Sequence, residues 1–134
     1  MKNNIYFLSL ILITAVACGT ANIKNKVKSL DDAVTDYNVS LRWSMLDNVE
    51  AYHLRNNGEK IPLDRSAMST IRITGCTVLE QSVNEDVSEA VIKGEIDYYT
   101  TNTGTLKNVP FTHIWWYSDM AKRWYNGSDY PQFK

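Results

Sequence analysis

Residues 90–99 read AVIKGEIDYY, and residue types alternate along this stretch. Small or apolar residues fall on one parity and mostly polar residues on the other: Ala90, Ile92, Gly94, Ile96 and Tyr98 against Val91, Lys93, Glu95, Asp97 and Tyr99. Successive side chains of a β-strand point to opposite faces of the sheet. The stretch therefore predicts a strand with one apolar face and one mostly polar face.

Further strand signals lie on both sides of this stretch. Residues 68–81 are rich in Ile, Thr and Val, and Gly75 is expected to mark a bulge where a long strand bends. Turn residues at 84–86 and 102–104 delimit the alternating stretch, and residues 105–118 predict the next strand. Adjacent strands joined by such short turns pair in antiparallel fashion.

A short strand and a tail complete the sheet. A turn at 118–122 leads to a strand over 123–126 and then to residues 127–134. In this tail, Pro131 and Phe133 are expected to pack back on the sheet. The carboxyl-terminal part of the chain therefore predicts a four-stranded antiparallel meander.

Helical signals come before the strands. An apolar stripe recurs at steps of three and four residues: Leu30, Val34, Tyr37, Leu41 and Met45. Ser29 is the expected N-cap of this helix, and residues 44–47 repeat the capping pattern before a second, shorter helix that ends at residues 56–58. Helices grouped before strands predict an α+β fold, with two N-terminal helices packed on a curved four-stranded antiparallel sheet.

The amino terminus has the features of an export signal. Lys2 precedes an almost wholly apolar run over 5–16, which is shorter than the roughly 20 residues that span a bilayer. Residues 10–21, LILITAVACGTA, end this run with small residues and Cys18. A basic start, a short apolar core and a small-residue exit are typical of a secretory signal peptide, here residues 1–17.

Residues 15–19, AVACG, resemble the bacterial lipobox, with Ala15 where Leu is more common. The resemblance implies cleavage before Cys18, a diacylglycerol thioether on its sulfur and a fatty acyl group such as palmitate on its amine. The alternative is an ordinary signal peptide with an incidental cysteine just after the cut. Residues 18–28 are interpreted as the lipidated cysteine and a tether, whose lysines either contact anionic headgroups or are simply solvated.

Composition excludes several classes of function. The net charge is −1, so no basic excess favours nucleic acid as a partner. With Cys18 lipidated, Cys76 is the only other thiol, so no internal disulfide forms, and Cys76 is interpreted as a core residue rather than a reactive thiol. His53 and His113 lack a carboxylate cluster, so no metal site is predicted. No phosphate-binding glycine loop or nucleophile elbow is present, and no cofactor is expected.

Several aromatic motifs carry a resemblance: DYN at 36–38, LRW at 41–43, WWY at 115–117, KRWY at 122–125 and YPQF at 130–133. Together they resemble small bacterial envelope lipoproteins with a nuclear-transport-factor-two-like (cystatin-like or SnoaL-like) α+β domain. The resemblance covers residues 29–134, which we take as one domain. It implies a helical motif followed by a curved sheet that closes on a Trp strand and a Pro-x-Phe tail.

Enzymes of this fold, such as ketosteroid isomerases and polyketide cyclases, place acids or Tyr–Asp sets in the cone between helices and sheet. The residues to consider here are Tyr37, His53, Asp97, Tyr98 and His113. Asp97 falls on the polar strand face, whereas Tyr98 falls on the apolar face. His113 shares a face with two aromatic residues and is interpreted as packed, and His53 as a helix-end residue. No catalytic residue is assigned.

Aromatic residues are the most distinctive feature of the sequence. Trp115 and Trp116 must point to opposite faces, so that one is in the core and the other lies on the outer face. Either they form cross-strand pairs that stabilise the sheet, or they belong to a binding surface. Arg42 either pairs with an acid near Trp43 or binds an anion. The candidate pocket or contact residues are Tyr37, Trp43, Tyr98, His113, Trp115, Trp116, Tyr117 and Trp124.

The expected function is that of a lipid-anchored, non-enzymatic binding or scaffold module of the bacterial envelope. Gly19, rather than Asp, follows the lipid cysteine, which by resemblance implies the periplasmic face of the outer membrane. The partners are then the membrane and an envelope protein or small ligand. The alternative is a small isomerase- or cyclase-like enzyme with its active site in the cone, and an inhibitor-like or assembly role is also open. A cone filled by side chains favours the module, whereas a deep pocket with converging polar groups favours the enzyme or a ligand binder.

Overall fold

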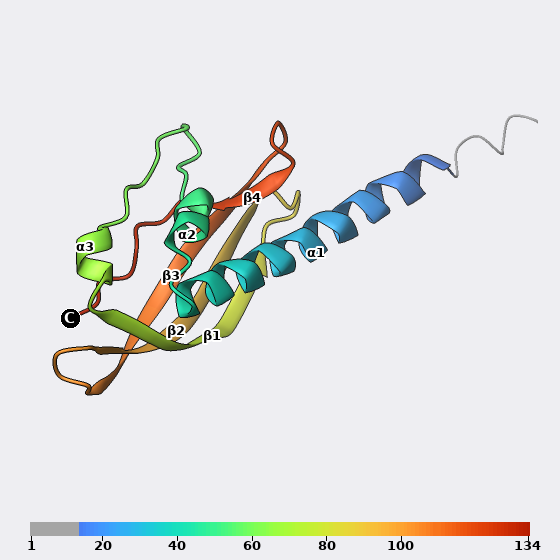
Figure 1. The fold of residues 1–134 in the computed structure, drawn as a ribbon. Helices are drawn as coiled ribbons and strands as arrows, with labels where there is room; N and C mark the ends of the chain where they lie inside the picture. Colours follow the sequence, from blue (N-terminus) through green and yellow to red (C-terminus); the bar gives the residue numbers. More distant parts are fainter. Residues whose placement is uncertain (1–13) are drawn as a thin grey trace, which may run out of the picture.

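The computed structural model describes residues 14–134, with side chains from residue 19 onward (Figure 1). Most of the predicted signal peptide therefore lies outside the described residues, and only the backbone of Cys18 is described. Within this range, no helix has both the length and the apolar character that crossing a membrane requires.

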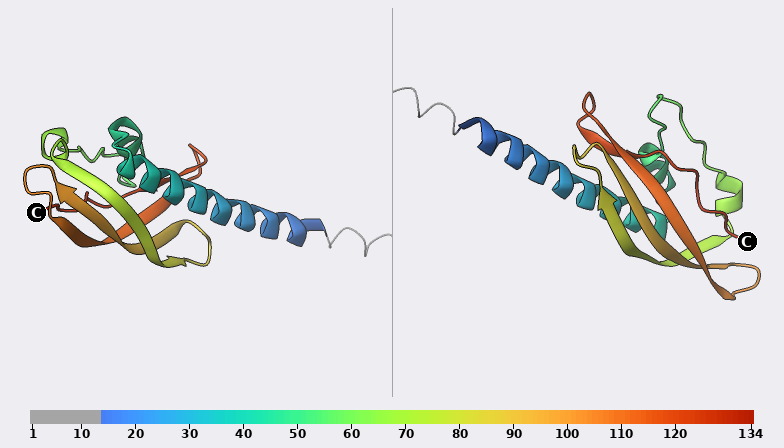
Figure 2. Two further views of the ribbon diagram at one scale, coloured as in Figure 1. Left: turned by 60° about the horizontal axis from the view of Figure 1, so that its bottom comes forward. Right: turned by 180° about the vertical axis from the view of Figure 1, so that it is seen from behind.

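The fold is α+β, as predicted, with an open four-stranded antiparallel sheet in the order β1-β2-β3-β4. All helices lie on one side of the curved sheet, and α1 continues well beyond its edge (Figures 1 and 2). The elements are α1 (Thr14–Arg42), α2 (Leu46–Tyr52), α3 (Arg65–Met68), β1 (Ile71–Val83), β2 (Glu89–Thr100), β3 (Leu106–Ser118) and β4 (Arg123–Asn126). The short helix α3 was not predicted, and the first strand begins at Ile71 instead of residue 68.

The predicted alternation of β2 is confirmed. Ala90, Ile92, Gly94, Ile96 and Tyr98 are all buried, whereas the other parity is exposed or half-buried. The expected bulge is also present, because the β1–β2 register shifts between Ile73 and Gly75. A second shift between Val78 and Glu80 was not predicted. Two irregularities in one strand help the sheet to bend around the helices.

The start of α1 corrects the sequence prediction. Residues 19–28, expected to be an irregular tether, are helical, and Ser29 lies inside the helix instead of capping it. The Ser29 hydroxyl donates to the Lys26 carbonyl at 2.8 Å. The Trp124 indole N–H donates to the same carbonyl at 3.0 Å and contacts the Ser29 Oγ at 3.2 Å. Trp124 of β4 therefore stabilises helical backbone at Lys26 and Ser29, where the sequence predicted that the helix would begin.

The helix stripe is otherwise confirmed, except at its end. Leu30, Val34, Tyr37 and Leu41 are buried, but Met45 is 51% exposed because α1 ends at Arg42. The second helix also ends earlier than predicted, at Tyr52, and residues 53 and 54 form bridges to residues 126 and 60. A long-range bridge to Asn126 and a local one to Lys60 replace the expected last turns of helix.

A polar contact at the surface fixes α2 on α1. The Asp36 carboxylate accepts hydrogen bonds from the Asn48 side-chain amide at 2.9 Å and from the Tyr52 hydroxyl at 2.7 Å. These two donors stabilise the charged carboxylate and lower the pKa of Asp36. These two hydrogen bonds to Asp36 position the end of α2, and the next residue, His53, is buried in the core.

Gly94 provides a test of the close packing of β2. A Cβ at this position would overlap the Thr77 carbonyl and the ring of Phe111, whereas a Cβ at Gly75 would only touch the Asp97 carboxylate at 3.4 Å. We expect Gly94→Ala to lower the free energy of unfolding by about 2–3 kcal/mol. The control Gly75→Ala should change it by less than about 1 kcal/mol. Urea titrations measure both values, and equal effects would contradict this account.

Candidate functional site

The cone between the sheet and helices α1 and α2 is filled by side chains. Tyr37 and Leu41 of α1 meet Ile92 and Ile96 of β2 and Trp115 of β3, and each of the five is at most 2% exposed. The Trp115 ring contacts Tyr37 edge-on, with ring centroids 5.6 Å apart. The interior of the cone is therefore filled, which favours a binding or scaffold module over an enzyme with a deep pocket.

Tyr37 and His53 form a buried hydrogen-bonded pair. The Tyr37 hydroxyl lies 2.7 Å from His53 Nε2, and His53 Nδ1 lies 3.0 Å from the Ser128 carbonyl oxygen. A carbonyl only accepts, so Nδ1 carries the proton, and burial lowers the pKa of His53 to about 4. The imidazole is therefore neutral at pH 7, and its Nε2 accepts a hydrogen bond from the Tyr37 hydroxyl, which keeps its proton. The ring of Tyr130 covers His53 at 3.8 Å between centroids.

His113 packs beside this pair without joining it. Its ring stacks on Phe111 at 4.3 Å and contacts Tyr37 edge-on at 5.7 Å. Within residues 19–134, its buried Nε2 has no hydrogen-bond partner. Burial, assisted by His53, lowers the pKa of His113 to about 3, so this ring is also neutral at pH 7. The arrangement agrees with the packed role expected for His113.

The other residues considered for catalysis lie elsewhere. Asp97 faces away from the cone and accepts a hydrogen bond from Asn108 at 2.8 Å. The Tyr98 hydroxyl lies at the open end of the cone, where it donates to the Lys134 carbonyl and accepts from the Lys134 N–H, both at 2.9 Å. The five residues are thus not gathered around one accessible space.

The aromatic candidates likewise do not form one surface. Trp115 and Trp124 are in the core, whereas Trp116 lies on the opposite face, stacks on Tyr125 at 5.2 Å and donates to the Leu54 carbonyl at 2.7 Å. Tyr117 contacts Trp124 across the β3–β4 ladder at 5.4 Å. These are the cross-strand pairs of the first alternative.

Trp43 is the exception among the aromatic candidates, because it is 70% exposed at the end of α1. The Arg42 guanidinium lies over the Trp43 ring, 5.9 Å from its centroid. The sequence had suggested an acidic side chain or a bound anion as the partner of Arg42, and not this ring. Cys76 is half-buried against the core, and burial raises the pKa of its thiol to about 11. This favours the structural interpretation of Cys76, since the reactive thiolate is scarce at neutral pH.

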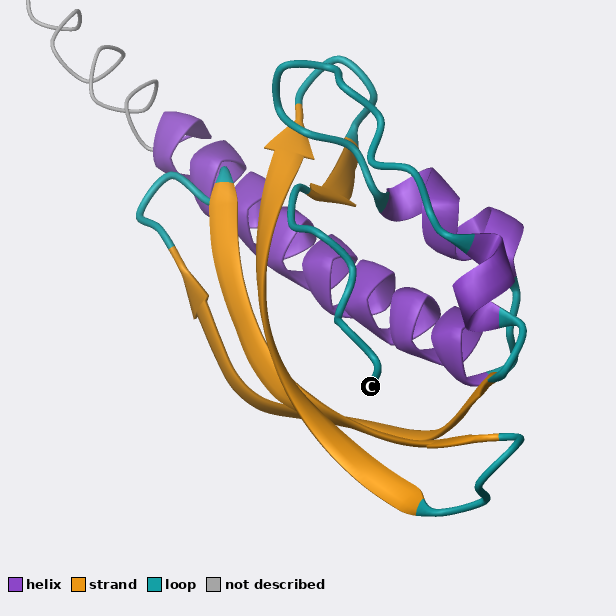
Figure 3. Cartoon of the chain, turned by 90° about the vertical axis from the view of Figure 1, so that its left-hand side faces the viewer, coloured by secondary structure: helices purple, strands orange, loops and turns teal. Residues whose placement is uncertain are grey.

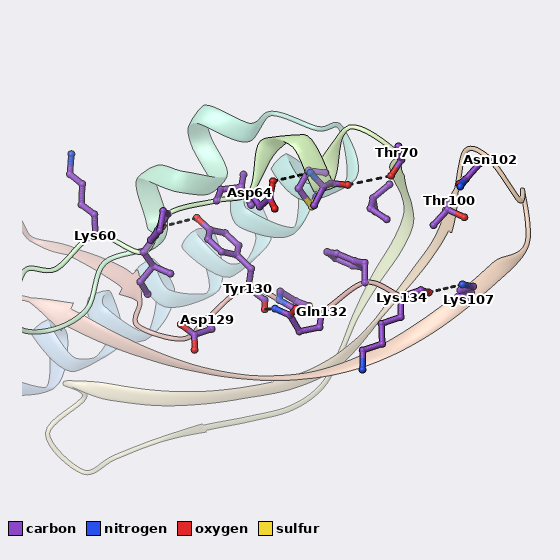
Figure 4. Close-up of a pocket in the computed structure, with 18 of the residues that line it drawn as sticks. Lys60, Asp64, Thr70, Thr100, Asn102, Lys107, Asp129, Tyr130, Gln132 and Lys134 are labelled. Atoms are coloured by element: carbon purple, nitrogen blue, oxygen red, sulfur yellow. Dashed lines mark hydrogen bonds between the residues drawn. The ribbon is translucent and has the colours of Figure 1, made fainter.

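A cavity of about 760 Å³ lies at the open end of the fold, and we call it the open-end cavity (Figure 4). Its walls are the loop over residues 59–64, helix α3, the β2–β3 turn and the tail over 129–134. Small-molecule and peptide sites in proteins have volumes of this order and mostly apolar walls. The apolar part of the wall consists of Ile61, Pro62, Leu63, Met68, Ile71 and Phe133.

Polar groups at the rim of the open-end cavity are mostly already engaged. Arg55 pairs with Asp129 at 2.7 Å. Asp64 caps α3 by accepting from the Ala67 N–H at 2.9 Å, and Lys107 donates to the Lys134 main-chain oxygen at 2.6 Å. In residues 19–134, no group of three His, Cys, Asp or Glu side chains is placed to hold a metal ion.

Sequence reasoning missed this cavity but predicted part of its wall. Phe133 does pack back on the sheet, against Tyr98 at 4.9 Å between ring centroids, and Pro131 lines the cavity. The remaining wall comes from segments far apart in the chain. Of this wall, only the packing of Pro131 and Phe133 back on the sheet was predicted, and the position of the cavity was not.

Comparison with known proteins adds no relative to this description. No protein-family model matches the chain, and searches of curated proteins and of solved structures found no match.

The two buried histidines predict that acid destabilises the fold. Each has a lower pKa in the folded chain than in the unfolded chain, so the unfolded state takes up more protons below about pH 6.5. Between pH 7 and pH 5, each histidine should remove about 2 kcal/mol from the free energy of unfolding. His113→Phe keeps the stack on Phe111 and should lose its share of this pH dependence. Urea titrations across this range measure the effect, and an unchanged slope in the variant would refute it.

Proposed function

We propose that this protein is a lipid-anchored module of the bacterial envelope that binds a partner without catalysing a reaction. One observation carries the proposal: the cone is packed solid, and the open-end cavity lies where the fold opens to solvent. A binding module needs an accessible recess, whereas an enzyme of this fold needs reactive groups within reach of its substrate. Tyr37 and His53, the hydrogen-bonded pair in the cone, are at most 2% exposed.

The geometry of α1 supports the anchored arrangement. With cleavage before Cys18, the helix runs without a break from the lipid-bearing residue to Arg42. At 1.5 Å per residue, this segment is about 36 Å long. Its amino-terminal part extends away from the sheet at the end opposite to α3 and the tail (Figure 1). The open-end cavity therefore faces away from the proposed membrane surface, toward the aqueous compartment.

The lipobox-like stretch at 15–19 and the resemblance to envelope lipoproteins support the location. Gly19 after the lipid cysteine favours the periplasmic face of the outer membrane in cells that have one. The isomerase- or cyclase-like alternative draws no support from the geometry, because its candidate residues are sealed in the core or point away from the cone.

The anchor is tested by replacing Cys18 with serine. The natural protein should fractionate with membranes and yield an acylated amino-terminal Cys18 peptide by mass spectrometry, because two or three acyl chains bind a bilayer almost irreversibly. Cys18→Ser should appear in the soluble or unprocessed fraction. A processed variant that still partitions fully with membranes would rule out the lipid anchor.

The binding role is tested by site-specific photocrosslinking in intact cells. A photoreactive amino acid at Asn102, on the rim of the open-end cavity, should form a discrete adduct with a partner. The matched control is Met120, which is 97% exposed in the β3–β4 turn, far from the cavity lining. Equal adducts from both positions, or none from Asn102, would contradict a binding role for the cavity.

A further inference from the structure

The tail over residues 127–134 lies on the concave side of the sheet and is nevertheless not part of the sheet (Figure 3). Its first residues are tied to β3, through Gly127 N–H to the Ile114 carbonyl at 2.9 Å and Ile114 N–H to the Ser128 hydroxyl at 2.7 Å. Beyond Ser128, the tail forms no backbone-to-backbone hydrogen bond with the described part of the chain. Side-chain contacts alone hold its last six residues.

Those contacts are of the kind that bind a peptide. The Tyr130 ring packs on His53 in a tilted arrangement, with ring centroids 3.8 Å apart, and its hydroxyl donates to the Ile61 carbonyl at 3.3 Å. Three residues later, Phe133 packs against Tyr98 at 4.9 Å. Two aromatic side chains thus occupy two separate receiving positions, on His53 and on Tyr98.

Polar groups fix the direction of the segment. The Tyr98 hydroxyl bridges the Lys134 N–H and carbonyl oxygen, and Lys107 donates to the same oxygen. Main-chain recognition of this kind accepts any residue at that position. We call His53, Ile61, Tyr98 and Lys107 the tail site.

We infer that the tail site, with the adjoining open-end cavity, is the binding site for an extended peptide segment of a partner protein that carries two aromatic residues three positions apart. The tail of this chain is its tethered occupant and competitor. The inference rests on the proposed binding role and names the partner chemistry. The spacing of the two aromatic residues in such a segment is taken from Tyr130 and Phe133 of the tail. The cavity of about 760 Å³ beside the tail leaves room for a bulkier segment than the tail itself.

Competition by the tail has a measurable consequence. A tethered segment acts at an effective concentration on the order of millimolar. A free peptide must therefore overcome the tail in the natural chain, but not in a chain whose tail is removed or weakened. Segments held by side-chain contacts alone open at low free-energy cost compared with strands of a sheet.

The test measures binding of a fluorescent peptide, Ser-Asp-Tyr-Pro-Gln-Phe-Lys, to the purified mature protein in detergent micelles. A chain ending at Asp129 keeps the Ser128 carbonyl for His53 and should bind the peptide at least tenfold more tightly than the natural chain. Phe133→Ser in the full-length chain weakens the tail without removing it and should give an intermediate gain. The peptide with serine at both aromatic positions should not bind either variant.

Matched variants on the two faces of β2 locate the site. In the shortened chain, Tyr98→Phe removes the hydroxyl that bridges the main chain of the last peptide residue and should weaken binding about tenfold. Tyr99→Phe lies on the opposite face and should have no effect. Circular dichroism reports whether each variant is folded, and Phe133→Ser serves if the shortened chain is not.

Three results would overturn the inference. One is the absence of peptide binding to folded variants with a released or weakened tail. Another is equal weakening by Tyr98→Phe and Tyr99→Phe. A third is a concentration-dependent dimer of the natural chain that disappears on shortening, which would assign the tail site to a second copy of this chain. Failure of this test with a positive crosslink from Asn102 would reject the peptide and leave the binding role intact, and loss of both would reject the proposed function.

Discussion

One imidazole connects the separate parts of this fold. His53 follows α2, accepts a hydrogen bond from Tyr37 of α1, donates to Ser128 after β4 and lies under the ring of Tyr130. Its backbone also forms a parallel bridge with Asn126. A buried polar side chain that loses its partner costs about 1–3 kcal/mol. The positions of α2, β4 and the tail are therefore coupled through a group that stays in the core only while it is neutral.

The same coupling keeps the Tyr37–His53 pair out of contact with solvent. A tyrosine hydrogen-bonded to a histidine is a common catalytic arrangement, and here both groups are present at 2.7 Å. However, the Tyr37 hydroxyl donates a hydrogen bond to His53 inside the core, and burial raises the pKa of Tyr37 well above its usual value. The pair is thus used for packing and orientation. The accessible recess is displaced to the end of the fold, where the tail and the loop over residues 59–64 meet.

The sequence predicted those features that a local period encodes. The parity of β2 and the stripe of α1 each repeat over several residues, so a single strand or helix sufficed to assign the buried face. The start of α1 was wrong because Trp124, almost a hundred positions away, stabilises the backbone at Lys26. The predicted end of α2 was wrong because His53 bridges to Asn126, more than seventy positions away. The open-end cavity has walls from four separate segments, and no local pattern encodes such a meeting.

The unbroken helix α1 has a consequence for where the domain can work. A flexible linker of the same number of residues would let the domain take any distance from the bilayer, up to the length of the extended linker. With the thioether of the lipoprotein proposal at its base, a stiff helix instead fixes the distance between the anchor and the binding face. Partners that reach that far from the lipid would meet the domain often, and those lying flat on the lipid would hardly meet it. The length and rigidity of one helix would then favour partners that extend about as far from the bilayer as the binding face does.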